Sequence, residues 1–207
     1  MKNIPERIAR SPLMQRGGFE VLSGVLDEHI LAMLLGEAME ALADARETAV
    51  PFSDSEEVRG GNPARRFLSS AAGSLQEGFS HAPWMLALLR ELCGPTLRPT
   101  GSLGTYSYYV RPGDHLDIHR DIETCDVAVI SCLYDTPGAA DGGMLGLYPG
   151  RIHEPLSAIR ARPDTGIIKL RLAAAETLVM FGGIVPHMVV PVAEEQSRIV
   201  SVLCYQV

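Results

Sequence analysis

The segment 113–121 places imidazole and carboxylate side chains at a spacing that suits a metal ion. It reads Gly-Asp-His-Leu-Asp-Ile-His-Arg-Asp and contains two overlapping His-x-Asp pairs, His115 with Asp117 and His119 with Asp121. On a β-strand, residues two positions apart face the same side. Either pair can therefore direct an imidazole and a carboxylate at one metal ion, and the spacing alone does not choose between them.

Another histidine and an arginine, both much later in the chain, extend this pattern. His187 lies in the apolar segment 181–192, and Arg198 stands at the start of the last β-type run. Two histidines and one carboxylate form the facial triad of non-haem Fe(II) oxygenases, which leaves coordination positions open. A buried arginine nearby can hold a dicarboxylic co-substrate through paired hydrogen bonds.

The C-terminal half must supply the strands that position these side chains. Short β-type runs separated by Gly, Pro and Asp follow residue 100, and they cover 105–110, 115–119, 127–134, 143–148, 167–172, 177–181, 187–190 and 198–205. Short strands with turn signals after a helical N-terminal half predict a jelly roll or a related double sheet.

The N-terminal half is predicted to be mostly helical. A short strand is expected at 19–22, followed by a helix that Asp27 caps and whose apolar residues recur at helical spacing. A second helix is expected to begin at Pro83 and to end at Gly94. The polar, Gly-rich segment 50–80 is expected to be a long loop with little regular structure, of the kind that often covers a binding site.

Composition narrows the class of protein. A chain of 207 residues with 46% hydrophobic residues is expected to fold as one domain and is not intrinsically disordered. The net charge of −7 argues against a general nucleic-acid binder, and no run approaches the roughly 18 apolar residues of a membrane span. Four cysteines without a CxxC spacing are expected to be reduced and mostly buried, in a cytoplasmic protein.

Features in order from Leu103 to Val207 resemble the Fe(II)- and 2-oxoglutarate-dependent oxygenase superfamily, particularly its prolyl-hydroxylase-like branch. Segment 108–113 resembles the strand and turn that enter the metal motif, and segment 131–134 resembles the next core strand. Segment 141–145 resembles the Gly-Gly that opens the following strand, and segment 179–187 resembles the strand-turn-strand that delivers the second histidine.

The resemblance implies a fold and a domain organisation. The fold would be mainly β with N-terminal helices, a double-stranded β-helix (jelly roll, cupin-like). Residues 1–207 would form a single oxygenase domain, with 1–100 as helical support and lid segment and 101–207 as the jelly-roll core that carries the metal site.

The resemblance also selects the metal ligands. In that branch the first metal histidine falls six residues after the turn glycine, here Gly113, which selects His119 and Asp121 over the earlier pair. Together with His187 they would bind iron.

The co-substrate site follows from the same resemblance. Arg198 would pair with the distal carboxylate of 2-oxoglutarate, and the hydroxyl of Tyr134 would share that carboxylate. With Fe(II), 2-oxoglutarate and O2, the chain would hydroxylate a C–H bond of a small amino-acid-like molecule or peptide and release succinate and CO2. An aspartate at position 121 fits a hydroxylase better than the halogenating relatives, which leave that ligand position empty.

Substrate recognition is the part where this sequence departs from the peptide prolyl hydroxylases. A basic stretch with Arg151 and Arg162 is inserted between residues 148 and 167, and Arg65 and Arg66 lie in the N-terminal segment. These arginines are candidates for an anion-recognising wall over the iron, with a solvated basic loop as the alternative.

Two rival functions remain open at this point. A cupin-like metal-binding or sensor domain would keep the barrel without oxygenase activity, and it would have no need of a dicarboxylate clamp. A cupin isomerase or dioxygenase without co-substrate would use an additional histidine, which His115 can supply. The sequence makes no prediction of oligomeric state.

Overall fold

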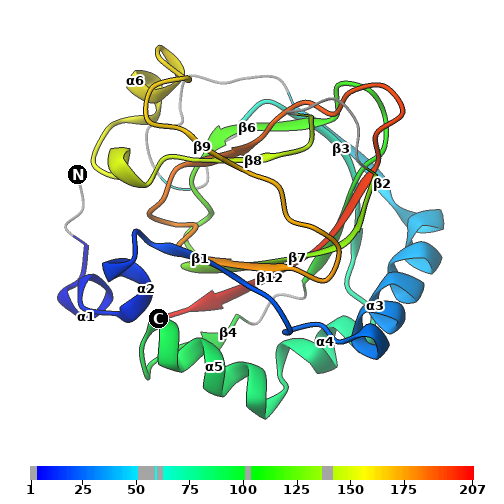
Figure 1. The fold of residues 1–207 in the computed structure, drawn as a ribbon, viewed down its shortest axis with the longest axis horizontal. Helices are drawn as coiled ribbons and strands as arrows, with labels where there is room; N and C mark the ends of the chain where they lie inside the picture. The colour runs from blue at the N-terminus through cyan, green and yellow to red at the C-terminus, as the bar shows by residue number, and fades with distance from the viewer. Residues whose placement is uncertain (1–3, 51–58, 60–62, 101–103, 137–141) are drawn as a thin grey trace.

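The computed structural model describes residues 4–50, 59, 63–100, 104–136 and 142–207 (Figure 1). Parts of the expected 50–80 loop, together with Leu103 and Asp141 of the matched segments, lie outside the described residues. None of the helices in the described ranges is long and apolar enough to cross a membrane.

An antiparallel sheet that folds over on itself forms the body of the molecule (Figure 1). Its hydrogen-bonded order is β1 (Phe19–Leu22), β10 (Thr177–Met180), β7 (Val127–Asp135), β12 (Arg198–Gln206), β5 (Thr105–Tyr109), β3 (Arg65–Ala71), β6 (His115–His119), β11 (His187–Val189), β8 (Leu145–Leu147) and β9 (Ile168–Leu170). Two short strands join it at the side: β2 (Arg46–Val50) pairs with β3, and β4 (Arg98–Pro99) pairs with β12. This topology confirms the expected jelly roll, and each strand expected after residue 100 is present.

Helices cover the outer face of the layer that contains β7 and β12 (Figure 1). They are α1 (Glu6–Ala9), α2 (Pro12–Gln15), α3 (Glu28–Ala41), η1 (Leu42–Asp44), α4 (Ser74–Ser80) and α5 (Pro83–Cys93), while η2 (Pro149–Arg151) and α6 (Leu156–Arg160) lie in the insertion. The expected helix starts are confirmed, because Asp27 accepts the Ile30 N–H and Pro83 occupies the first turn of α5.

Strand β7 contributes side chains to two hydrophobic cores, one beneath the helices and one between the sheet layers. Val127, Val129 and Leu133 pack beneath the helices, whereas Ala128 and Ile130 face the space between the two sheet layers. Because side chains alternate along a strand, a strand buried on both faces needs apolar residues at nearly every position. The inner space is the cavity that the candidate site occupies.

The expectation of a loop over 50–80 is wrong for two stretches. Residues 65–71 form β3, which pairs with both β5 and β6 and so joins the two sheet layers. Residues 74–80 form α4, whose first N–H groups are capped by the carboxylate of Glu37 from the distant helix α3, at 2.7 Å from Leu75 N and 3.0 Å from Gln76 N. A cap supplied from elsewhere in the chain leaves no local sequence signal.

The expectation that all four cysteines are reduced is also wrong. Cys125 and Cys204 form a disulfide across a sequence separation of 79 residues, with Cα atoms 5.0 Å apart. Cys125 lies just before β7, and Cys204 pairs with Ala128 of that strand from the end of β12. Adjacent strands therefore bring the two thiols together. Cys93 and Cys132 are free and buried, as expected.

Candidate metal centre

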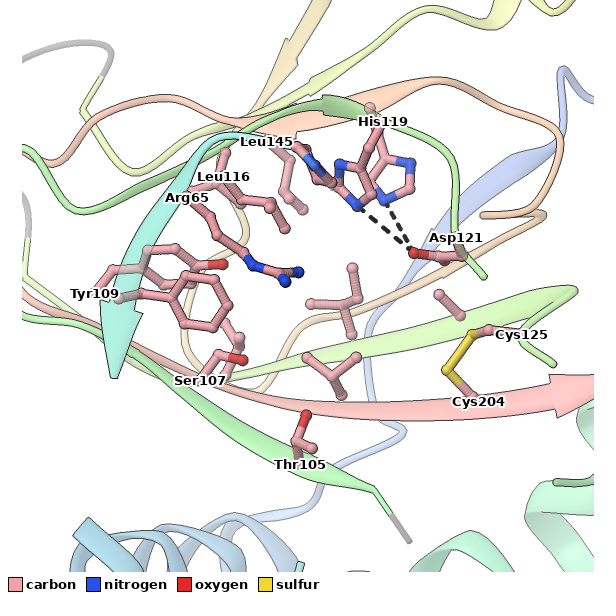
Figure 2. Close-up of a pocket in the computed structure, with 18 of the residues that line it drawn as sticks. Arg65, Thr105, Ser107, Tyr109, Leu116, His119, Asp121, Cys125, Leu145 and Cys204 are labelled. Carbon is pink, nitrogen blue, oxygen red and sulfur yellow. Dashed lines mark ion pairs between the residues drawn. A yellow bond between two sulfur atoms is a disulfide. The ribbon is translucent and has the colours of Figure 1, made fainter. Parts of the chain in front are cut away.

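Three side chains meet at one end of the inner cavity (Figure 2). His119 ends β6 and His187 begins β11, and the two are direct partners in the antiparallel ladder. Asp121 follows two residues after β6, and its Oδ1 lies 3.6 Å from Nε2 of both histidines. One ligand atom from each of the three residues lies within 4.8 Å of the others, which is a spacing that one metal ion can bridge.

Both imidazoles are oriented by backbone carbonyls. Nδ1 of His119 lies 2.8 Å from the Asp117 carbonyl, and Nδ1 of His187 lies 3.0 Å from the Val185 carbonyl. A hydrogen bond donated from Nδ1 fixes the tautomer and leaves Nε2 as a lone-pair donor. Both histidines therefore present their metal-binding nitrogen to the same carboxylate.

The electrostatics favour the metal-binding form of Asp121 and His119, whereas the adjacent Asp121 carboxylate outweighs burial and raises the pKa of His187, whose proton a metal ion would displace. Burial disfavours the charged form of Asp121, yet the adjacent His187 and His119 outweigh it and hold the pKa of Asp121 well below its usual range. Burial and the neighbouring His187 lower the pKa of His119. A carboxylate and a neutral imidazole are the forms that bind a metal.

The second carboxylate oxygen of Asp121 supports the same assignment. Oδ2 is buried and accepts no hydrogen bond from the residues that the structure describes. A buried, unpaired carboxylate oxygen is costly unless an ion or ligand compensates it. The residues present therefore fit a metal ion bound by two histidines and one aspartate.

A β-bulge in β6 decides which His-x-Asp pair reaches the cavity. His187 pairs with His119 but Val189 pairs with Leu116, so β6 carries one more residue than β11 over this stretch. The extra residue places both Leu116 and His119 on the cavity wall. His115 does not line the cavity, and its Nδ1 bonds the Gly113 carbonyl at 2.8 Å.

Arg198 lies in the same cavity and is 1% exposed. Its Nη1 is 3.4 Å from the Leu172 carbonyl and 3.7 Å from Asp135 Oδ1. Its Nη2 is buried and has no hydrogen-bond partner within the described part of the chain. A buried guanidinium with an unused N–H group is suited to a carboxylate ligand.

The structure does not bring Tyr134 into the cavity. A second bulge lies between Ile199, which pairs with Tyr134, and Val200, which pairs with Cys132. Val200 faces the cavity, whereas Ile199 packs in the outer core, so the bulge turns Tyr134 to the outer face. The side chain is 44% exposed, and its hydroxyl accepts a hydrogen bond from Thr136 at 2.8 Å.

Tyr109 lines the cavity (Figure 2), as Arg198 does. The two residues are ladder partners across β5 and β12, and the Tyr109 ring stacks on Phe67 with centroids 5.0 Å apart. Sequence reasoning missed this residue, because only the strand pairing shows that it adjoins Arg198.

Of the candidate substrate arginines, Arg65 lines the cavity, and Figure 2 shows its guanidinium pointing into it. Arg66 follows on the alternate face of β3 and lies outside the cavity lining. Its guanidinium donates to the Pro112 carbonyl and to Asp114 Oδ1, the latter at 3.2 Å, and so secures the turn before β6.

The arginines of the insertion do not form a wall over the metal site. Arg151 is buried, and its N–H groups are bonded to the Glu154 carboxylate and to the carbonyls of Ala158, Arg162 and Thr165. The Arg162 side chain is 66% exposed, with Nη2 3.9 Å from Glu154 Oε2. Neither arginine lines the cavity, so the expected basic wall is wrong for this pair.

Comparisons with solved structures show which fold this is. Three similar structures are a non-haem α-ketoglutarate-dependent epimerase, SnoN, from nogalamycin biosynthesis (TM-score 0.72, 18% identity, 97% of this chain and 80% of that one), a Pseudomonas putida prolyl-4-hydroxylase (0.64, 16%, 97% and 98%), and AviO1 from Streptomyces viridochromogenes Tue57 (0.70, 15%, 100% and 97%). SnoN has also been solved with Fe3+, α-ketoglutarate and nogalamycin RO.

No protein-family model matches the chain, and no curated protein matches it. The similarity to solved structures, at 15–18% sequence identity, therefore shows the fold of the chain. The chain has the double-stranded β-helix fold of the Fe(II)- and 2-oxoglutarate-dependent oxygenases, and inside that fold a possible iron-binding triad shares one cavity with a buried arginine.

Proposed function

We propose that the chain is an Fe(II)- and 2-oxoglutarate-dependent dioxygenase that hydroxylates a C–H bond of a small amino-acid-like molecule or peptide, with release of succinate and CO2. One observation carries the proposal. His119, Asp121 and His187 converge in the same cavity, of about 430 Å3, that holds the buried Arg198. A facial triad can bind the iron, and a buried arginine in the same cavity can bind a carboxylate of a dicarboxylic co-substrate.

The three ligands would hold Fe(II) at this end of the cavity. With 2-oxoglutarate bound, Fe(II) supplies the oxygen-activating redox chemistry, which belongs to the cofactor. The chain contributes the orientation of the ligands: each histidine is held by a backbone carbonyl, and Asp121 is held by its own backbone N–H, which donates to Gly182 O at 2.9 Å. Rigid ligands favour one coordination geometry.

Arg198 and Tyr109 would bind the distal carboxylate of 2-oxoglutarate. The guanidinium offers Nη2, and the phenol next to it lines the same wall. Apolar side chains, among them Ile130, Leu145 and Val200, form much of the remaining lining. Their apolar surface limits water in the cavity, and a charge-assisted hydrogen bond is stronger there than in bulk water.

Arg65 is the candidate that would orient the substrate. It is the one of the four proposed substrate arginines that lines the cavity, and its guanidinium points into the cavity from β3 (Figure 2). A cation at this position suits a carboxylate of an amino acid or peptide. Solved structures with this fold include a prolyl-4-hydroxylase, an epimerase and a carbocyclase, SnoK. The fold therefore does not determine which reaction is catalysed, and the residues of the site do.

The test separates the oxygenase from a metal-binding or sensor domain. Purified protein is supplied with Fe(II), 2-oxoglutarate and O2, and succinate is measured with a panel of amino acids and short peptides. A parallel anaerobic titration of 2-oxoglutarate into the Fe(II) protein follows the visible charge-transfer band of the chelate. We expect the band in the wild type and substrate-dependent succinate for at least one panel member. Tight metal binding without a band or 2-oxoglutarate decay would instead identify a sensor domain.

A further inference from the structure

Arg59 binds the segment that carries the aspartate ligand. Its guanidinium donates to the carbonyls of Asp121 at 3.1 Å, Ile122 at 2.5 Å and Cys125 at 2.7 Å, and to the carboxylate of Asp126 at 2.7 Å. One side chain therefore makes four hydrogen bonds to residues 121–126, which lie more than sixty positions later in the sequence. No other hydrogen bond from a distant side chain reaches the Asp121 backbone among the described residues.

The same guanidinium packs on the turn that leads to the second histidine. A Cβ at Gly183 would lie 2.5 Å from the Arg59 guanidinium, so the absence of a side chain there makes room for it. The turn and the 121–126 segment are also joined directly, because Asp121 N donates to Gly182 O at 2.9 Å and Gly183 N donates to Asp126 O at 3.4 Å. Arg59 thus lies where the two ligand-bearing segments meet.

Asp121 needs such support more than the histidines do. His119 and His187 are strand residues in a ladder, whereas Asp121 follows the end of β6 and pairs in no strand. Its carboxylate is the ligand that both Nε2 atoms face at 3.6 Å. A small change in the backbone at this residue changes the distance from the carboxylate to both imidazoles. Partners that orient metal ligands typically account for 10–100-fold in metal affinity.

We propose that Arg59 is a positioning residue for the metal centre: it binds the carbonyls of Asp121, Ile122 and Cys125 and packs on Gly183, and so fixes the Asp121 carboxylate against the two histidines. This inference rests on the proposed metal site and adds to it a residue of the N-terminal half that no motif marks. Arg59 does not line the cavity, and it acts through the backbone of the aspartate ligand.

The test measures metal binding directly, without turnover. Mn(II) is titrated into the full-length wild type, Arg59→Gln and Arg59→Lys, and the Co(II) absorption spectrum of each protein is recorded as a readout of coordination geometry. Arg151→Gln is the matched control, because Arg151 also donates to several backbone carbonyls but binds only the insertion. Thermal unfolding of each variant reports its stability separately.

We expect Arg59→Gln to weaken Mn(II) binding about 10–100-fold and to alter the Co(II) spectrum. Arg59→Lys should recover part of the affinity, because an ammonium can pair with Asp126 but cannot reach all four acceptors. Arg151→Gln should lower the unfolding temperature and leave Mn(II) affinity within about twofold of wild type. If Arg59→Gln fails to fold, Arg59→Lys and its partial rescue by added guanidinium provide the measurement.

Two results would overturn the inference, and they differ from failure of the proposed function. Folded Arg59→Gln with wild-type Mn(II) affinity and an unchanged Co(II) spectrum would make Arg59 a structural residue only. An equal loss of affinity in Arg59→Gln and Arg151→Gln would show that general destabilisation is the cause. Absence of Mn(II) and Fe(II) binding in the wild type would refute the metal site itself.

Discussion

His187 and His119 are direct partners in the antiparallel ladder between β11 and β6, with ring centroids 4.1 Å apart. The backbone hydrogen bonds of two strands therefore set the distance between the two imidazoles, so this distance does not depend on a flexible loop. Each ring is turned by a carbonyl two residues earlier in its own strand or turn. The two histidine ligands are therefore held in position before any ion binds.

His119→Ala should abolish high-affinity Mn(II) binding, whereas His115→Ala should leave it unchanged. The bulge in β6 places His119 in the cavity, and His115 instead bonds the Gly113 carbonyl outside it. Isothermal titration of Mn(II) into both variants checks this prediction. Equal losses in the two variants, or a greater loss in His115→Ala, would contradict the ligand assignment and favour the cupin alternative with an additional histidine.

Gly182→Ala should weaken Mn(II) binding by about tenfold or more. A Cβ at this position would collide with Oδ2 of Asp121, so the carboxylate must move away from the histidines. Gly36→Ala is the control, because a Cβ at Gly36 in helix α3 meets nothing within 4 Å. That change should stabilise the helix by about 0.5–1 kcal/mol and leave metal affinity unaltered. Wild-type affinity in Gly182→Ala would show that the carboxylate does not need this space.

Tyr109→Phe should weaken 2-oxoglutarate binding, and Tyr134→Phe should not. Tyr109 lines the cavity next to Arg198, while Tyr134 faces outward and bonds Thr136. Loss of one hydrogen bond to a charged group costs about 1.5–3 kcal/mol, which is about tenfold or more in affinity. The charge-transfer band of the anaerobic Fe(II) protein measures both variants. A loss confined to Tyr134→Phe would restore the tyrosine that the sequence resemblance implied.

Local patterns in the sequence predicted most of the fold. The run at Val127 is apolar at nearly every position because β7 is buried on both faces, and Asp27 caps α3 as a side-chain acceptor should. Strand β3 was missed because its polar residues resemble a loop. It is a strand because β5 and β6 pair with it on either side, and this pairing depends on tertiary structure.

Two β-bulges decide where the His-x-Asp pairs and Tyr134 lie relative to the cavity. A β-bulge adds a residue to one strand and reverses the alternation of side chains beyond it. The bulge near Leu116 places His119 in the cavity, and the bulge near Cys132 removes Tyr134 from it. Alternation read from sequence assumes regular strands, so it cannot choose between the His-x-Asp pairs. The disulfide of Cys125 and Cys204 follows from the adjacency of β7 and β12, and the contacts of Arg59 join segments outside the strands that no local pattern marks.

Arg65→Ala should lower substrate-coupled turnover by about tenfold or more and leave uncoupled decay of 2-oxoglutarate in place. The guanidinium points into the cavity, so its loss removes a contact to the substrate and not to the metal ligands (Figure 2). Arg162→Ala is the control, since the Arg162 side chain is 66% exposed and does not line the cavity. The measurement compares succinate release with product formation for the best substrate of the panel. Unchanged coupling in Arg65→Ala would remove this arginine from the substrate site.

Arg198→Ala should weaken 2-oxoglutarate binding without emptying the metal site. Hydrogen bonds to a charged group contribute about 1.5–3 kcal/mol, so the loss should be about tenfold to several hundredfold in affinity. Asp135 keeps its partner when Arg198 is removed, because Arg171 Nη1 binds both of its carboxylate oxygens, at 3.2 and 2.9 Å. The variant therefore does not leave that buried carboxylate without a cation.

Arg198→Lys should recover only part of the loss, because an ammonium lacks the planar fork of the guanidinium. Mn(II) affinity should stay at the wild-type value in both variants, since His119, Asp121 and His187 are untouched. The measurement is a 2-oxoglutarate titration of the anaerobic Fe(II) protein, with a Mn(II) titration beside it. Normal 2-oxoglutarate affinity in Arg198→Ala would count against the oxygenase, because the buried Nη2 would then have no dicarboxylate to bind, and a metal-binding domain of cupin type would account for the site.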